Sequence, residues 1–201
     1  CSEDLTAEEI GKTWLNYTPY EHGMFAWGGY GHMTENTAYM NLRAGIPAPL
    51  SGSIAMNGEA TAQQIGGQIF IDCWGLVNPG NPQRAARLAR KAASVSHDGE
   101  AINGGIFVAS AVAVAFEMRD VRAIMDLALS LLPQDSEYVR MARDVYAFHD
   151  AHPDDWRACF GFVKEHYGYA CDPGMCHVIP NSAVMILSMP YGENEYTRTS
   201  N

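Results

Sequence analysis

The sequence has no long hydrophobic run and few basic residues, and both absences limit what the chain can do. Its longest apolar stretch, from Ile102 to Phe116, is interrupted by Asn103 and Ser110 and is too short to span a bilayer. Lysine and arginine together number 13 against 23 aspartates and glutamates, which gives a formal net charge of -10. We therefore expect no membrane partner, and the charge argues against a nucleic acid as the main partner.

Several catalytic motifs are also missing from the sequence. It contains no GxSxG, HExxH or Walker motif, and the GGYG of residues 28 to 31 is not the GxGxxG of a dinucleotide site. The acidic, amphipathic start CSEDLTAEEIGKTW lacks the basic beginning of a signal peptide. We expect a reduced, cytoplasmic protein, because the cysteines are odd in number and scattered. They are Cys1, Cys73, Cys159, Cys171 and Cys176.

What the sequence does contain is a series of helix signals. Thr6 and Glu9 form a capping box, and Pro82 follows a turn at the first position of another helix. No stretch shows the sustained alternation of a strand, so we predict an all-α fold, a compact multi-helix bundle of about seven or eight helices in one domain, 1–201. Expected helices cover 6–16, 34–42, 59–77, 98–116, 120–132, 138–148 and 156–167, one begins at Pro82, and a last one is capped by Asn181 and ends before Pro190.

Two of these helices have unusual compositions. The one after Asp98 is apolar nearly all round, which predicts a central, buried position. The one expected at 59–77 contains Gly66, Gly67 and Gly75, which lower helix stability. We expect these glycines to allow close approach by another helix or by a ligand.

The segment Ser96-His97-Asp98-Gly99 precedes the buried helix and has two interpretations. Asp98 could cap that helix, with Gly99 relaxing the turn and His97 half-exposed in a loop. Alternatively, the helix N-terminus faces a cleft, where its free N–H groups suit an anionic ligand and His97 is a hydrogen-bond partner. The spacing alone favours the first interpretation.

Two other segments are candidates for a site. Cys171 to His177 has the residue types of a metal or redox site, but the spacing of its cysteines is not CxxC, and two free thiols around a turn explain it more simply. Residues 25 to 39, which include His32 and Glu35, fit an aromatic-lined ligand loop and a plain packing loop equally well.

Three stretches of the sequence resemble the ADP-ribosylglycohydrolase family. The most specific is IGGQIFIDCWGLVNPGNPQRAARLARKAASVSHDGEAINGGIFVASAVAVAF, residues 65 to 116. Residues 12 to 54, with WGGYGHMTENTAYMNLRAGIPAPLSGSI, are similar to one bacterial branch, and IPNSAVMILSMPYGENEY, residues 179 to 196, resembles the penultimate region of the family. The resemblance covers essentially the whole chain.

The resemblance implies a fold and a reaction. The fold would be the all-α fold of this family, and the reaction would be hydrolysis of the glycosidic bond at the anomeric carbon of ADP-ribose. The partner would be an ADP-ribosylated protein or a small ADP-ribose-containing substrate. Two Mg²⁺ ions would orient the ribose hydroxyls and a water and would help to stabilise an oxocarbenium-like transition state.

The resemblance also implies substrate-binding residues. Ser96-His97 matches a Ser/Thr-His motif whose histidine lines the ADP-ribose cleft, and it leaves Asp98 divided between cap and contact. The Gly-rich ribose and phosphate loops would correspond to Gly28-Gly29-Tyr30 and to Asn57-Gly58 or Gly66-Gly67. The expected substrate-binding set is His97, Asp98, Gly29, Tyr30 and Gly67.

The sequence departs from the family at the metal site. The N-terminal Thr-Asp-Asp motif and the C-terminal Asp-x-Asp-Thr motif of the family are absent, and Asp154-Asp155 lies in the wrong region. We therefore assign no metal ligand and no catalytic acid. We expect the chain to be the central part of a longer enzyme, truncated at both ends and inactive alone. The alternatives are a relative that binds ADP-ribose or a nucleoside without hydrolysis, and a helical scaffold with a vestigial cleft.

Overall fold

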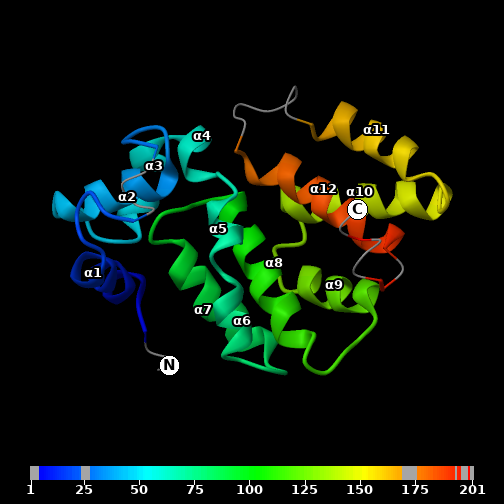
Figure 1. Ribbon diagram of the computed structural model, residues 1–201, viewed down its shortest axis with the longest axis horizontal. Helices are drawn as coiled ribbons and strands as arrows, with labels where there is room; N and C mark the ends of the chain where they lie inside the picture. Colours follow the sequence, from blue (N-terminus) through cyan, green and yellow to red (C-terminus); the bar gives the residue numbers. More distant parts are fainter. Residues whose placement is uncertain (1–4, 24–27, 169–175, 193, 196–198, 200–201) are drawn as a thin grey trace.

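The computed structural model describes residues 5–23, 28–168, 176–192, 194, 195 and 199, and this part of the chain is helical with no strand. Its helices form an elongated body with α8 (Glu100–Val114) near the centre (Figure 1). The predicted all-α class is confirmed. None of the described helices is both long and apolar enough to cross a membrane.

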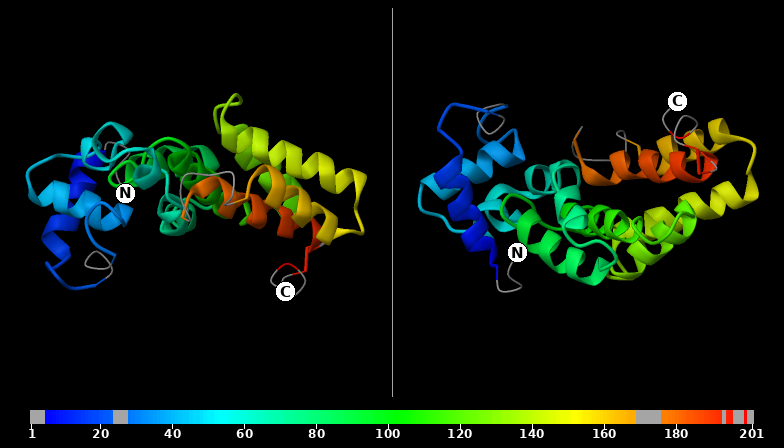
Figure 2. Two further views of the ribbon diagram at one scale, coloured as in Figure 1. Left: turned by 90° about the horizontal axis from the view of Figure 1, so that it is seen from above. Right: turned by 60° about the horizontal axis from the view of Figure 1, so that its bottom comes forward.

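The helices follow one another along the long axis of the molecule (Figure 1 and Figure 2). One end holds α1 (Ala7–Tyr17), α2 (Thr34–Arg43), the 3-10 turn η2 (Leu50–Gly52), α3 (Ile54–Asn57) and α4 (Glu59–Ala62). The middle holds α5 (Gly66–Ile69), α6 (Asp72–Leu76), α7 (Pro82–Ala93) and α8. The other end holds α9 (Val121–Ser130), α10 (Glu137–Ala151), α11 (Trp156–His166) and α12 (Val178–Tyr191).

The capping signals in the sequence place the starts of α1 and α7 correctly. At α1, the amide of Glu9 donates to the Thr6 hydroxyl at 3.2 Å and the amide of Thr6 donates to the Glu9 carboxylate at 2.8 Å. At α7, the Asn81 side chain accepts from the amide of Arg84 at 3.1 Å, and Pro82 occupies the first turn. Both caps satisfy amides that have no partner within the helix.

The buried helix α8 is the centre of the main hydrophobic core, as its composition predicts. Glycines in the short helices α5 and α6 allow α8 to pack closely against them. A Cβ atom on Gly75 would lie 2.5 Å from the carbonyl oxygen of Ala109, and one on Gly67 would lie 2.8 Å from that of Ala101. The expected close approach is therefore confirmed. The core continues through side chains of α7, α9, α10 and α12, among them Ala89, Met125, Val145 and Ile186.

The single helix expected at 59–77 is wrong, because this segment forms three short helices, α4, α5 and α6. At the break between α4 and α5, the backbone forms hydrogen bonds with a distant segment of the chain instead of helical bonds. The amide of Ile65 donates to the Cys176 carbonyl at 2.7 Å, and the amide of Val178 donates to the Gln63 carbonyl at 2.9 Å. These bonds replace helical bonds that glycine-rich sequence makes weak.

The limits expected for the last helix are also wrong. His177, not Asn181, is the N-cap residue of α12, and its Nδ1 accepts from the amide of Ile179 at 3.2 Å. Asn181 lies inside the helix and donates to the His177 carbonyl at 2.7 Å. The helix continues through Pro190 to Tyr191, so the proline does not end it.

Candidate functional site

The site is built where the loop from α7 to α8 meets the segment around η2. The Ser51 hydroxyl donates to the Val95 carbonyl at 2.7 Å, and the amide of Ile54 donates to the Asp98 carboxylate at 3.0 Å. Between these bonds, a Cβ atom on Gly52 would lie only 2.3 Å from the carbonyl carbon of Ser96. The backbone on either side of His97 is therefore held in one position.

His97 is buried and half satisfied. Its side chain is among the most buried in the chain, and its Nδ1 lies 2.7 Å from the Ser96 hydroxyl. Its Nε2 has no hydrogen-bond partner among the described residues. Burial lowers the pKa of His97 to about 3, because the surroundings disfavour the imidazolium. The ring is therefore neutral near pH 7, with one nitrogen available.

Glu35, in the first turn of α2, is the acidic group beside this nitrogen. Its Oε1 lies 3.6 Å from His97 Nε2, which is too long for a hydrogen bond. Only 4 % of Glu35 is exposed, and burial raises the pKa of its carboxyl group. The two groups are thus a neutral imidazole and a carboxyl group that holds its proton more tightly than usual, rather than an ion pair.

Two glycines of α5 shape the space around this pair. A Cβ atom on Gly66 would lie 1.8 Å from Glu35 Oε1 and 2.8 Å from His97 Nε2. A Cβ atom on Gly67 would lie 3.2 Å from His97 Cγ. A side chain at Gly66 would meet both polar atoms of this pair, so glycine leaves room for them to face each other.

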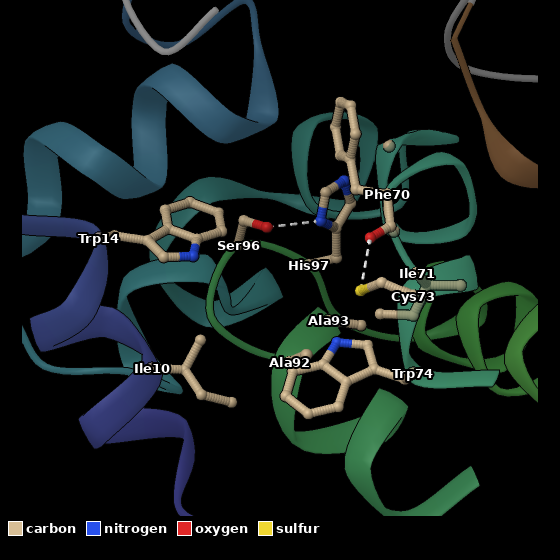
Figure 3. A pocket seen from close by; sticks show the side chains of 12 residues that line it. Ile10, Trp14, Phe70, Ile71, Cys73, Trp74, Ala92, Ala93, Ser96 and His97 are labelled. Carbon is tan, nitrogen blue, oxygen red and sulfur yellow. Dashed lines mark hydrogen bonds between the residues drawn. The ribbon is translucent and has the colours of Figure 1, made fainter. Parts of the chain in front are cut away.

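A largely apolar cavity of about 360 Å³ opens beside His97. In the close-up view, Trp14 lies to the left of Ser96, and Trp74 lies below His97 (Figure 3); all four residues line the cavity. Aromatic side chains of this kind can pack against a flat ring. The remaining walls come from α1, from the segment of α5 and α6, and from α7, and they include Ile10, Phe70, Ile71, Cys73, Ala92 and Ala93.

The structure tests the two interpretations of the segment from Ser96 to Gly99. Gly99, with φ of 57°, is the N-cap residue of α8, and no side chain caps the helix there. The Asp98 carboxylate instead accepts from the amides of Ile54 and Gly99. Asp98 as the cap of α8 is therefore wrong, and so is a half-exposed His97. A contact between Asp98 and a ligand stays a prediction.

The predicted substrate-binding residues fall into two places. Gly67 and His97 line the cavity just described. Gly29 and Tyr30 line a separate cavity of about 290 Å³, together with Tyr39 and other residues of the N-terminal end. The Tyr30 hydroxyl donates to Asn41 at 3.1 Å. The structure does not bring the two sets into one cavity, and contact of Gly29 and Tyr30 with ADP-ribose stays a prediction.

The described residues do not fit a magnesium pair. Among them, no three His, Cys, Asp or Glu side chains gather closely enough to hold a metal ion. Near His97 the carboxyl group is that of Glu35, whereas Mg²⁺ prefers several oxygen ligands. The candidate at Cys171 to His177 lies mostly outside the described residues; within them, Cys176 is an exposed thiol and His177 caps α12.

The sequence indicates Glu35 only as part of the candidate loop of residues 25 to 39 and does not place it beside His97. Its partner His97 is 62 positions away, and only the fold brings the two together. The sequence shows only that α2 begins with the polar run Thr34-Glu35-Asn36-Thr37, and the structure adds that all four residues are buried. Polar residues are seldom buried without a partner, so such a run at a helix start indicates either a polar network or a site.

One comparison with known proteins identifies a family for the chain. A family model described as ADP-ribosylglycohydrolase matches residues 3–199, which is nearly the whole chain. No curated protein and no solved structure matches the chain.

Proposed function

The chain belongs to the ADP-ribosylglycohydrolase family, and from this premise we propose that the cavity at His97 binds the ADP-ribosyl part of a substrate. The reaction served is hydrolysis of the glycosidic bond at the anomeric carbon of ADP-ribose. The proposed partner is an ADP-ribosylated protein or a small ADP-ribose-containing compound, and the proposed location is the cytoplasm.

The observation that carries the proposal is the unpartnered Nε2 of His97. A buried polar atom without a partner costs free energy, and native proteins keep few of them. A ribose hydroxyl or a phosphate oxygen would supply the missing partner. Because Ser96 contacts Nδ1, its hydroxyl donating to that nitrogen would leave the proton on Nε2, where it can be donated to a ligand.

The neutral state of His97 limits its role to hydrogen bonding and positioning. With a pKa of about 3, the ring does not offer a positive charge to a phosphate near pH 7. Glu35 is the carboxyl group next to it, and its raised pKa suits a group that gives or accepts a proton. Glycosidases usually employ two carboxyl groups, and the described surroundings of His97 provide one.

We propose that the hydrolysis depends on magnesium, but we assign no residue as a ligand. The resemblance to the family implies two Mg²⁺ ions, but the described residues do not fit them. We propose that any ligands are residues other than those around His97, and we derive no step through the metal. The same observation favours a second candidate function, binding of ADP-ribose or a nucleoside without hydrolysis.

Calorimetric titration of the chain with ADP-ribose tests the proposal. We expect saturable binding that weakens about tenfold or more in His97→Ala, because one hydrogen bond to a buried partner is lost. His166→Ala, at an exposed position in α11, is the control and should bind normally. Circular dichroism and thermal melting would show whether each variant is folded.

A turnover assay tests where the metal site lies. Incubation of this chain with an ADP-ribosylated protein and Mg²⁺ should release no ADP-ribose, because the described residues near His97 provide no set of metal ligands. Binding without release would support the ligand site at His97. Hydrolysis would then require residues outside this cavity. Release that depends on Mg²⁺ would show that the metal site has been misplaced, and absence of any binding would contradict both functions.

A further inference from the structure

Tyr146 of α10 is a second buried side chain with an unsatisfied polar atom. Only 4 % of the residue is exposed, and its hydroxyl has no hydrogen-bond partner among the described residues. The guanidinium carbon of Arg122 lies 3.6 Å from the centre of its ring. Burial raises the pKa of the Tyr146 phenol, so the hydroxyl stays protonated and can donate.

Tyr138, two turns earlier on the same helix, shows that the fold satisfies such a group elsewhere. Its hydroxyl, equally buried, donates to the Gln68 side chain at 2.9 Å. A tyrosine hydroxyl that is buried without a partner is costly, and phenylalanine would avoid the cost. The contrast between Tyr138 and Tyr146 indicates that the hydroxyl of Tyr146 serves something other than stability.

A cavity of about 380 Å³ in the groove between α9 and α10 is lined by Tyr146 and, one turn away, by Arg143. Arg143 donates to the Gln134 side-chain oxygen at 2.6 Å. Gln134 is itself fixed, because its amide nitrogen donates to the carbonyls of Leu129 and Leu132. The charge of Arg143 is thus held in place by a neutral acceptor, and no carboxylate pairs with it in the described part of the chain.

The other end of the cavity has the opposite character. Arg122 contacts Asp126 at 3.3 Å and Asp150 at 3.4 Å, so its charge is already matched by two carboxylates. These aspartates line the same cavity. They disfavour a ligand with two negative charges, because like charges repel. The lining therefore suits one negative charge, placed at the Arg143 end.

We propose that this cavity binds a small organic carboxylate. One oxygen accepts a hydrogen bond from the Tyr146 hydroxyl, the carboxylate faces Arg143, and the short aliphatic part lies toward Leu129 and Val139. The site is built from α9 and α10, whereas the cavity at His97 is built from α1 and α5 to α7. Its test is therefore independent of ADP-ribose binding.

The experiment is an NMR titration of the chain with sodium butyrate, with sodium chloride keeping the ionic strength constant. Butyramide, a neutral ligand of the same shape, and inorganic phosphate are titrated in parallel. We expect saturable shifts at α9 and α10 with butyrate, and much weaker shifts with butyramide and phosphate. Equal response to butyramide, or a stronger response to phosphate, would overturn the assignment to a carboxylate.

Two variants test the named contacts. Tyr146→Phe should bind butyrate about tenfold more weakly, yet melt about 2–4 °C higher than the parent, because an unpaired hydroxyl has been removed. Arg143→Gln should abolish the saturable response. Tyr138→Phe, the matched control, should bind butyrate normally and melt at a lower temperature. Unchanged butyrate affinity in Tyr146→Phe, or no saturable shift in the parent, would contradict the proposal.

Discussion

The two ends of the molecule are held together in different ways. The C-terminal end, α9 to α12, shares one continuous apolar core with α7 and α8 of the middle. The N-terminal end, α1 to α4 with η2, has a small apolar cluster around Leu42, Ala48 and Val95 and depends on buried polar side chains. Asn41, for example, donates to the Ser51 carbonyl and to Asn57, each at 2.9 Å.

The difference explains where the candidate site lies. Apolar packing has little directionality, whereas hydrogen bonds between buried groups require a defined geometry. His97 lies at the seam, where the polar contacts of the N-terminal end meet the first turn of α8. A ligand-binding group placed there is fixed by polar contacts on one side and by the core on the other.

The largest effect is expected in the apolar core. Ile106→Ala, at a fully buried position of α8, should lower the free energy of unfolding by about 2–5 kcal/mol, since it removes packing and leaves a cavity. Urea denaturation would measure it. Val184→Ala, at a position of α12 that is 43 % exposed, is the control and should change the value by about 0.5 kcal/mol or less. Similar costs at both positions would contradict a single shared core.

The next largest effect on stability is expected at the seam between the N-terminal end and α8. Gly52→Ala places a Cβ atom against the backbone of Ser96, and we expect a loss of up to about 3 kcal/mol with weaker ADP-ribose binding. Gly161→Ala in α11 is the matched control, because nothing lies within 4 Å of its Cβ position. That variant should be about 0.5–1 kcal/mol more stable. Equal tolerance of both changes would show that the seam is loose.

The pH dependence of stability gives a further test of the seam. The unfolded His97 takes up a proton as the pH falls through about 6.5, whereas the folded one, with a pKa of about 3, does not. Its contribution to stability is therefore present above pH 6.5 and is lost as the pH falls toward 3. Between pH 7 and 5 the loss is about 2 kcal/mol.

Glu35 changes the stability with pH in the opposite direction to His97. It must therefore be replaced before the effect of His97 can be measured. Its pKa is raised in the folded state, so its contribution is lost as the pH rises through that value. We would compare Glu35→Gln with the double variant Glu35→Gln/His97→Gln in urea at pH 5, 6 and 7. A difference between them that does not change with pH would mean that His97 is accessible to protons in the folded state.

The smallest effect tests whether Asp98 holds the amide of Ile54 or caps α8. Asp98→Ala should cost about 1 kcal/mol, because the amide of Ile54 loses its acceptor. Hydrogen exchange should accelerate at Ile54 and remain unchanged at Ile102, whose amide bonds to the Gly99 carbonyl. Acceleration throughout the first turn of α8 would instead identify Asp98 as its cap.

The sequence predicts the apolar core better than the seam. The buried character of α8, the capping box at Thr6 and the helix start at Pro82 depend on residues close together in the chain, and they were predicted correctly. The break after α4 depends on bonds between Ile65 and Cys176, which no local pattern contains. Glu35 and His97 meet for the same reason, through tertiary contacts, so composition and spacing did not reveal their pairing.

Hydrogen exchange with and without ADP-ribose tests the central claim most directly. If the ligand binds at the seam, amides of Gly66, Gly67 and the segment from Val95 to Asp98 should exchange more slowly when ADP-ribose is present. Amides of α9 to α12 should be unaffected by the nucleotide. Protection confined to α9 to α12, or no protection anywhere, would contradict the assignment of the site to His97.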